Sequence, residues 1–217
     1  MSKEEAEGRG RKVYRAKSFA MSAMSCPGCH LSLAEPVDQC PRCHYTGEIS
    51  MRKFPFPAPA MNRFIDPQDH FSESDRARLS KALNDLLKKF PQVRICFCII
   101  NLPEGVDLRE FGFWMMNVSP VDTPEEAEVR PWTILIVIDD INGNVSVTPG
   151  YAIEPFLEDQ AWSALIRNEK QYFFARDYVV AGLKMIEGAE VILQEGALRT
   201  ERALSVRGSE RKSRRER

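Results

Sequence analysis

The chain lacks any hydrophobic run long enough to cross a membrane. Its longest apolar stretches, residues 95–100 and 133–138, have the length of strands, whereas a transmembrane helix needs about 20 consecutive apolar residues. The N-terminal sequence MSKEEAEGRGRK has no apolar core of the kind that secretory signals carry. We therefore expect a protein that neither spans a membrane nor is exported.

Motifs of several enzyme classes are also missing. No glycine-rich loop of the type that cradles phosphate groups occurs, and of the three histidines only His70 lies outside the cysteine-rich region. The composition is ordinary for a globular protein, with 28% charged and 43% hydrophobic residues and a net charge of −1. Composition therefore predicts a folded domain without indicating a reaction.

The small net charge conceals two basic ends. Residues 1–20 carry six Lys or Arg and three Glu, and residues 199–217 carry eight Lys or Arg and three Glu. The final segment, RGSERKSRRER, is typical of a disordered, solvated tail. Such a tail either attracts nucleic acid or anionic lipid weakly, or serves only to keep the protein soluble.

What the chain does contain is a pair of Cys-x-x-Cys motifs. Cys26 and Cys29 form the first, Cys40 and Cys43 the second, and ten residues separate the two motifs. Each motif places two thiolates on one tight turn, and two such turns complete a tetrahedron around Zn2+ with sulfur at about 2.3 Å. The short loop between them is too small to build a core, so we expect the metal to supply its folding free energy. The spacing predicts a structural zinc ribbon over residues 19–50.

Other interpretations of these cysteines fit the sequence less well. A redox pair is disfavoured because two pairs occur and neither begins a helix after an apolar strand. Disulfides belong to exported chains, whereas zinc-type cysteines without an export signal favour the reducing cytoplasm. His30 and His44 each follow a motif, but four cysteines already fill a closed site, so we interpret both histidines as exposed loop residues.

The rest of the chain divides by composition. Residues 1–18 are polar and predicted to be disordered, and residues 51–61 alternate proline with apolar residues, which favours a semi-rigid linker. Residues 62–195 are predicted to form a second domain, followed at 196–217 by the end of a helix and the basic tail.

Hydrophobic periodicity predicts an α/β fold for the second domain. Cys96 and Cys98 lie two apart on a strand, hence on one face, and are interpreted as core residues. Strand–helix–strand order implies a parallel pair with a right-handed crossover, and the turn at Asn142-Gly143 implies an antiparallel return strand. The expected architecture is a mixed β-sheet flanked by helices on both faces. The predicted elements are helix 73–89, strand 93–100, helix 107–117, loop 119–131, strand 132–138, strand 145–148, and helices 157–170 and 176–204.

The order of these elements resembles the TPM-domain family, which is named after a thylakoid acid phosphatase, a photosystem II repair protein and an acetylcholine-receptor regulator. The resemblance covers residues 62–195. It departs from the family at two glycines, which are replaced here by Ala152 and Arg176. The segments that carry it are Ile65-Asp66-Pro67, Phe71-Ser72, Phe113-Trp114, Ile138-Asp139-Asp140, residues 145–154, Asp159 and residues 173–178.

The resemblance implies a site more clearly than an activity. Some relatives are similar to acid phosphatases and some bind Ca2+ through acidic residues; among the matching acids is Asp66. The resemblance thus implies a Ca2+ or Mg2+ site, because both cations prefer oxygen ligands. Capping of turns and helices is the alternative role for these acids. The predicted cation ligands are Asp139, Asp140, Glu154 and Asp159.

These observations together predict a cytoplasmic binding or scaffolding module whose ribbon contacts a protein partner. A metal-dependent acid-type phosphatase is the alternative, with no catalytic residue assigned. We expect no membrane partner. Nucleic-acid binding is not favoured, because the ribbon offers only Arg42, His30, His44 and Tyr45 for it.

Overall fold

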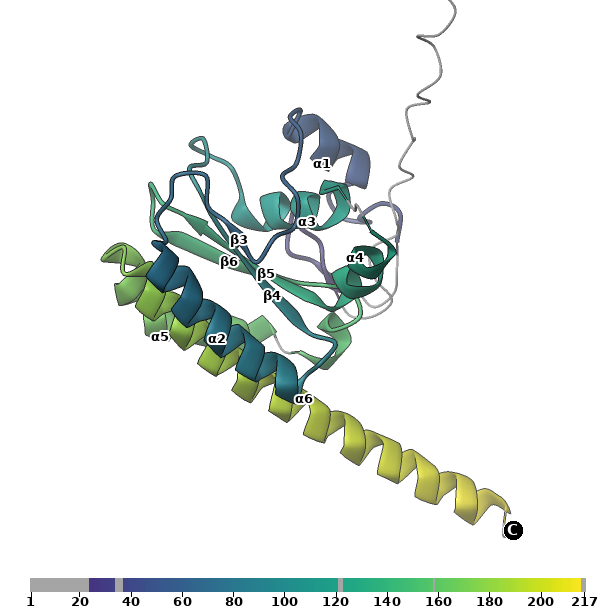
Figure 1. The fold of residues 1–217 in the computed structure, drawn as a ribbon. Coiled ribbons are helices and arrows are strands. Elements are labelled where there is room, and N and C mark those ends of the chain that lie inside the picture. The colour runs from purple at the N-terminus through teal and green to yellow at the C-terminus, as the bar shows by residue number, and fades with distance from the viewer. Residues whose placement is uncertain (1–23, 34–36, 121–122, 158, 216–217) are drawn as a thin grey trace, which may run out of the picture.

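The computed structural model describes residues 24–33, 37–120, 123–157 and 159–215. The predicted disordered N-terminus, residues 1–18, lies outside these ranges. A four-stranded sheet forms the centre of the molecule, in the order β3-β4-β5-β6 (Figure 1). The first three strands are parallel and the last is antiparallel. The bounds are β3 (Phe64–Ile65), β4 (Arg94–Ile100), β5 (Thr133–Asp139) and β6 (Asn144–Pro149).

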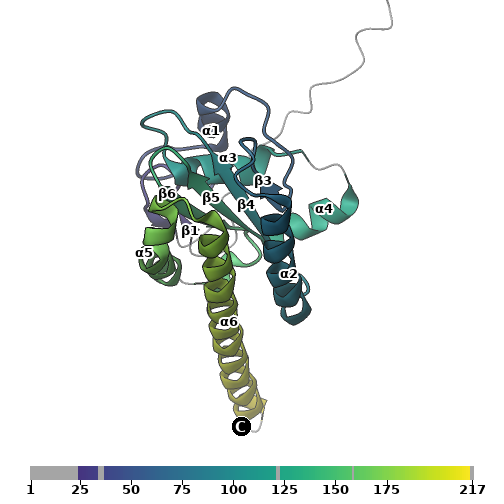
Figure 2. The ribbon, with the colours of Figure 1, turned by 60° about the vertical axis from the view of Figure 1, so that its left-hand side comes forward.

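Helices cover both faces of this sheet, as the sequence predicts. One face carries α2 (Glu73–Lys89), α5 (Asp159–Phe174) and α6 (Tyr178–Arg215), and the other carries α3 (Leu108–Val118) with α1 (Gly47–Lys53) outside it (Figures 1 and 2). Three short helices complete the fold: α4 (Pro124–Val129) and η1 (Arg130–Trp132) precede β5, and η2 (Glu154–Phe156) follows β6. No helix in the described ranges is both long and apolar enough to cross a membrane.

The two central strands divide their side chains between two cores. Ile95, Phe97 and Ile99 of β4 point toward α2 and α6, whereas Cys96 and Cys98 point toward α3. The same alternation continues along β5, because successive side chains of a strand point to opposite faces. Both strands are buried on both faces, which explains their nearly continuous apolar sequence.

Helix α2 shows how local signals set an element's bounds. Ser72 accepts a hydrogen bond from the Asp75 backbone N–H, and the Asp75 carboxylate accepts one from the Ser72 backbone N–H, which forms a capping box. The buried residues Leu79, Leu83 and Leu86 recur at helical spacing on the face that meets the sheet.

The cysteine-rich segment forms a small subdomain that rests on α3. It contains the hairpin of β1 (Met24–Ser25) and β2 (Ser32–Leu33), and its buried residues Leu33, Cys26, Cys40 and Tyr45 pack with Phe113 of α3. This subdomain is therefore joined to the sheet domain through a helix that both share.

Three segments differ from the sequence predictions. Helix α4 lies inside the predicted loop 119–131, where Thr123 caps the helix and Pro124 opens it. Helix α1 crosses the predicted boundary between ribbon and linker, and Phe54 of the linker is buried among aromatic side chains of α3. Helix α6 continues to Arg215, where a disordered tail was expected, because residues 197–215 are rich in helix-forming Ala, Arg and Glu and contain no proline.

Candidate functional site

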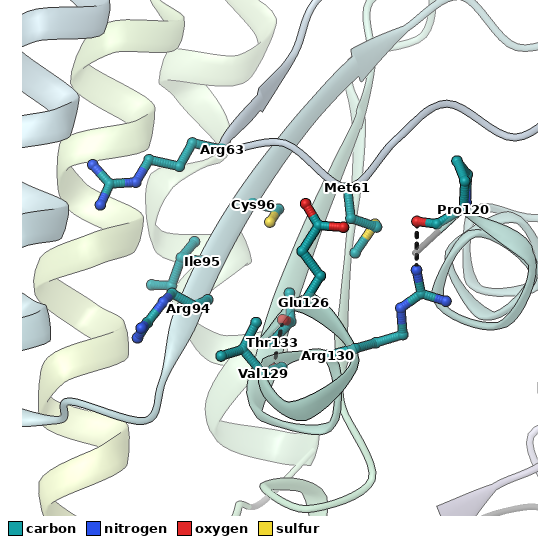
Figure 3. Close-up of a pocket in the computed structure, with 10 residues that line it drawn as sticks. All are labelled: Met61, Arg63, Arg94, Ile95, Cys96, Pro120, Glu126, Val129, Arg130 and Thr133. Carbon is teal, nitrogen blue, oxygen red and sulfur yellow. Dashed lines mark hydrogen bonds between the residues drawn. The ribbon is translucent and has the colours of Figure 1, made fainter. Parts of the chain in front are cut away.

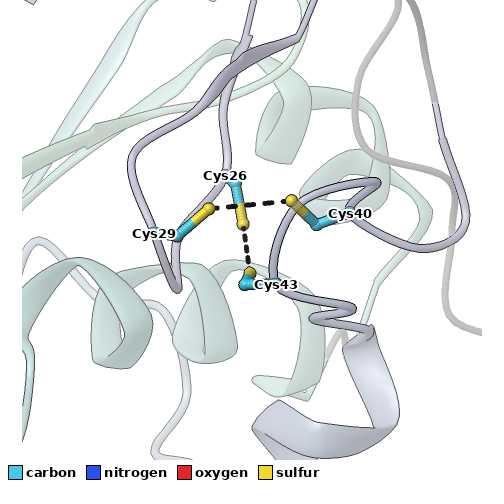
Figure 4. A group of neighbouring side chains, drawn as sticks. All are labelled: Cys26, Cys29, Cys40 and Cys43. Atoms are coloured by element: carbon cyan, nitrogen blue, oxygen red, sulfur yellow. Dashed lines mark hydrogen bonds between the residues drawn. The ribbon is translucent and has the colours of Figure 1, made fainter.

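The four cysteines meet at one point between two loops. The Sγ atoms of Cys26 and Cys43 lie 3.6 Å apart, those of Cys29 and Cys40 lie 3.7 Å apart, and all four lie within 4.8 Å of one another (Figure 4). A tetrahedral metal with sulfur at about 2.3 Å requires sulfur–sulfur separations of about 3.8 Å. A disulfide requires about 2.05 Å, and all four cysteines are free. The geometry fits a tetrahedral metal ion such as zinc.

Two loops of the same construction position these thiols. His30 donates its backbone N–H to the Cys26 carbonyl, and His44 donates to the Cys40 carbonyl, both at 2.9 Å. Both histidines have left-handed backbones, with φ of 58° and 59°. The residue after each motif thus turns the chain back and holds its pair of thiols on a tight turn.

Burial and backbone hydrogen bonds shift the pKa values of the thiols in opposite directions. Burial raises the pKa of Cys26 to about 12. Burial acts in the same direction on Cys40, but hydrogen bonds from the backbone of Cys43 and Arg42 outweigh it and lower the pKa of Cys40 to about 6. N–H groups that donate to sulfur stabilise the thiolate, which is the form that binds metal.

The two histidines are not ligands in this arrangement. Among the described His, Cys, Asp and Glu side chains, the four cysteines alone form a group suited to a metal. Arg109 donates from Nη1 to Nδ1 of His30 at 3.0 Å, and His30 Nε2 lies 3.8 Å from Asp107 Oδ2. His30 therefore connects the ribbon to the start of α3.

Further contacts fix the ribbon to α3. The rings of Tyr45 and Phe113 meet edge to face, with centroids 6.1 Å apart. Lys53 at the end of α1 forms an ion pair with Glu110, a buried carboxylate of α3. The cysteine cluster thus lies beside the sheet domain and not on a free arm.

The predicted acidic site does not assemble at the end of β5. Asp139 points to the α3 side of the sheet, where its carboxylate accepts hydrogen bonds from the Ile141 N–H at 3.1 Å and the Asn142 amide at 2.7 Å. Asp140 points to the opposite side and accepts a hydrogen bond from the Tyr178 hydroxyl. Adjacent strand residues point to opposite faces, so the two carboxylates serve separate structural roles.

Glu154 is separated from both by the length of the hairpin. Because β6 is antiparallel to β5, Gly150 lies opposite Thr133 at the start of β5, and η2 follows there. Strand β5 is seven residues long, so about 20 Å separate that end from Asp139. Asp159 begins α5, and its side chain lies outside the described part. Asp139, Asp140 and Glu154 therefore do not form the single cation site that the resemblance implies.

A different polar cluster lies where the parallel strands end. His70 Nε2 is 3.8 Å from Asp140 Oδ2, and Arg176 Nε is 3.4 Å from Asp140 Oδ1. Burial first, and then the hydrogen bond to Asp140, raise the pKa of Tyr178 above its ordinary value. Sequence reasoning missed His70 and Tyr178, because their contact with Asp140 crosses three separate elements.

Asp66, the remaining matching acid, is also used by the fold. Its carboxylate accepts the backbone N–H groups of His70 and Phe71, each at 2.9 Å, and pairs with Arg76 at 2.9 Å. These bonds tie the end of β3 to the start of α2.

A small pocket of about 130 Å3 lies at the opposite end of the strands (Figure 3). Three arginines line it, but two are held by backbone carbonyls: Arg94 donates to Pro91 at 2.7 Å, and Arg130 donates to Pro120 at 2.8 Å. Arg63 also lines the pocket. Since the guanidinium groups of Arg94 and Arg130 hold loops in place, we interpret the pocket as a structural contact between loops and not as a ligand site.

Comparison with known proteins gives a family match. A search of curated proteins found no match. The N-terminal domain of cg2496 protein from Corynebacterium glutamicum is 15% identical, with a TM-score of 0.45 over 63% of this chain and 82% of that one. The N-terminal domain of a P. gingivalis protein is 14% identical, with a TM-score of 0.44 over 70% of this chain and 90% of that one. The model of the TPM domain matches residues 64–191, more than half of the chain, and the protein therefore belongs to the TPM-domain family.

Proposed function

We propose that this protein is a non-enzymatic binding module in which a structural Zn2+ fastens the ribbon to the TPM domain. The observation that carries the proposal is the group of four thiols, whose 3.6 and 3.7 Å separations match a tetrahedral site. Soft thiolate ligands in a tetrahedral set favour zinc over hard cations such as Mg2+ and Ca2+.

A metal bound by four thiolates serves structure. Catalytic zinc sites keep one position for water or substrate, whereas four protein ligands fill a tetrahedron. The ribbon has a small core, in which only Leu33 and Tyr45 are fully buried apart from two of the cysteines, among the residues described. The metal accordingly supplies free energy that this core cannot.

Binding is favoured over hydrolysis by how the charged groups are used. Asp66, Asp139 and Asp140 each accept hydrogen bonds from the protein itself, so their carboxylates hold loops and helix ends in place. The metal-dependent phosphatase stays a prediction of the family resemblance. We place the module in the cytoplasm, because a reducing compartment keeps cysteine thiols free to bind metal.

Elemental analysis of the purified protein tests the zinc assignment. We expect one Zn2+ per chain, lost in Cys40→Ser because three thiolates leave the tetrahedron open, while Cys96→Ala, a change in the sheet core, keeps the metal. Protein prepared without chelator that contains no metal would contradict the assignment. Hydrolysis of para-nitrophenyl phosphate by the wild type in Ca2+ or Mg2+, above a buffer blank, would contradict the non-enzymatic role.

A further inference from the structure

The outer side of β6 is an edge of the sheet that the described residues form. Gly150 donates its N–H to the Thr133 carbonyl at 2.7 Å, and bonded and non-bonded pairs alternate along an antiparallel ladder. Every second residue of β6 therefore directs its backbone groups away from β5. Among the described residues no strand pairs with this side. The outward residues are Val145, Val147 and Pro149, of which the proline offers a carbonyl alone.

A groove of about 500 Å3 runs beside this edge. The beginning of α3 and His30 of the ribbon form one wall, and the middle of α5 forms the other. His30 is the lining residue that comes from the ribbon, so the ribbon contributes to one wall of the groove.

The two walls differ in chemistry. The α3 wall presents Arg109 and His30, with Asp107 as its only acid among the described lining residues. The α5 wall presents Trp162 and Ile166, with Arg167 as its charged residue. Neither arginine has a carboxylate partner in the described part of the chain, and the lining holds two arginines against one aspartate, so the groove carries an excess of positive charge.

The α5 wall also contains an unused hydrogen-bond donor. Trp162 is 4% exposed, and its indole N–H has no acceptor among the residues described. A buried N–H without a partner costs about 1–3 kcal/mol. The wall thus holds a buried donor that the described chain leaves without an acceptor.

We propose that the β6 edge binds an extended acidic segment of a partner protein as an additional strand. Main-chain bonds to Val145 and Val147 would give affinity, as in other cases of strand addition. Side chains of the added strand alternate between the two walls, so apolar residues meet Trp162 and acidic residues meet Arg109. This inference rests on the proposed binding function and specifies its partner.

The positive charge of the groove selects this occupant. A second copy of the chain, joined edge to edge, would bring Arg109 and Arg167 of both molecules into one groove, and like charges at close range repel. An acidic strand instead gains from the same charges, and this gain is screened by salt.

Amide exchange with a defined peptide tests the proposal on the wild-type protein. The probe is a fluorescent peptide of alternating glutamate and valine. We expect it to slow exchange at the Val145 and Val147 amides, while Ser146, whose N–H already points to β5, changes little. Binding that leaves Val145 and Val147 unprotected overturns the proposal.

Variants separate the backbone contact from the charge. Val147→Pro removes an outward N–H but no hydrogen bond to β5, and we expect it to lower the affinity for the peptide by about tenfold. Val147→Thr keeps the N–H, and we expect it to keep the affinity. If Val147→Pro does not fold, Arg109→Glu provides the second measurement, with at least about tenfold loss expected. Equal binding of a lysine–valine peptide, or a wild-type dimer that Val147→Pro dissociates, overturns the proposal. Zinc content and phosphatase assays do not involve this edge, so they report separately on the proposed function.

Discussion

Phe54 tests whether the proline-containing segment is part of the folded domain. Sequence predicts a linker there, but Phe54 is 5% exposed and its ring lies 5.5 Å from Phe111 and 5.1 Å from Trp114, measured between centroids. A linker side chain of this kind contributes to the core on the α3 face.

The size of the effect follows from this burial. Replacing a fully buried phenylalanine by alanine costs about 3–5 kcal/mol, because transfer free energy is lost and a cavity remains. Phe56 is the matched control: it lies two residues away, its ring contacts Trp114 at 5.0 Å, but it is 48% exposed. We expect about 1–2 kcal/mol for Phe56→Ala, since half of its surface is already in water.

Urea unfolding of the metal-loaded protein, followed by circular dichroism, measures both variants. Phe54→Ala should lower the free energy of unfolding by at least about 1 kcal/mol more than Phe56→Ala does. Equal losses in the two variants would show that Phe54 belongs to a detached spacer and that the ribbon and the sheet domain are independent units.

Two further predictions concern the polar cluster beside α6. Arg176 has a left-handed backbone with φ of 57°, so Arg176→Gly should be more stable than Arg176→Ala by about 1 kcal/mol in urea unfolding; equal stabilities would contradict backbone strain. Burial and the hydrogen bond to Asp140 raise the pKa of Tyr178 above the ordinary 10. The protonated hydroxyl therefore stabilises the fold fully below pH 10, and this stabilisation is lost as the pH rises further. Tyr178→Phe should therefore be less stable at pH 8 by about 1–3 kcal/mol but lose less stability above pH 10; parallel curves for the two proteins would refute this.

Elements with strong local signals were predictable from the sequence. Helix α2 has a capping serine and leucines at helical spacing, and β5 is an unbroken apolar run, so their expected and observed bounds agree within one residue. Helix α4 was missed because it has no buried residue and hence no apolar periodicity, although Thr123 and Pro124 carry a helix-start signal.

The candidate sites differ in the same way. The cysteine cluster depends on two short loops, so motif spacing alone indicated it. The contact between Asp140 and Tyr178 joins residues 38 positions apart and depends on how α6 packs against the sheet. The carboxylates of Asp139 and Asp140 lie apart because successive strand residues point to opposite faces. The family resemblance matches acids by their order along the chain, which does not show the face on which each one lies.

The length of α6 has a mechanical consequence. Arg199 still bonds to the Phe156 carbonyl of η2 at 3.2 Å, and the helix then continues to Arg215, projecting beyond the other elements (Figure 1). At 1.5 Å per residue, this part is about 24 Å long. A helix is stiff along its axis, so residue 215 is held at a set distance and direction from the domain, as at the end of a rod. A probe attached there would report on the domain's orientation, and its distance from a second probe on α2 would change little on binding at β6.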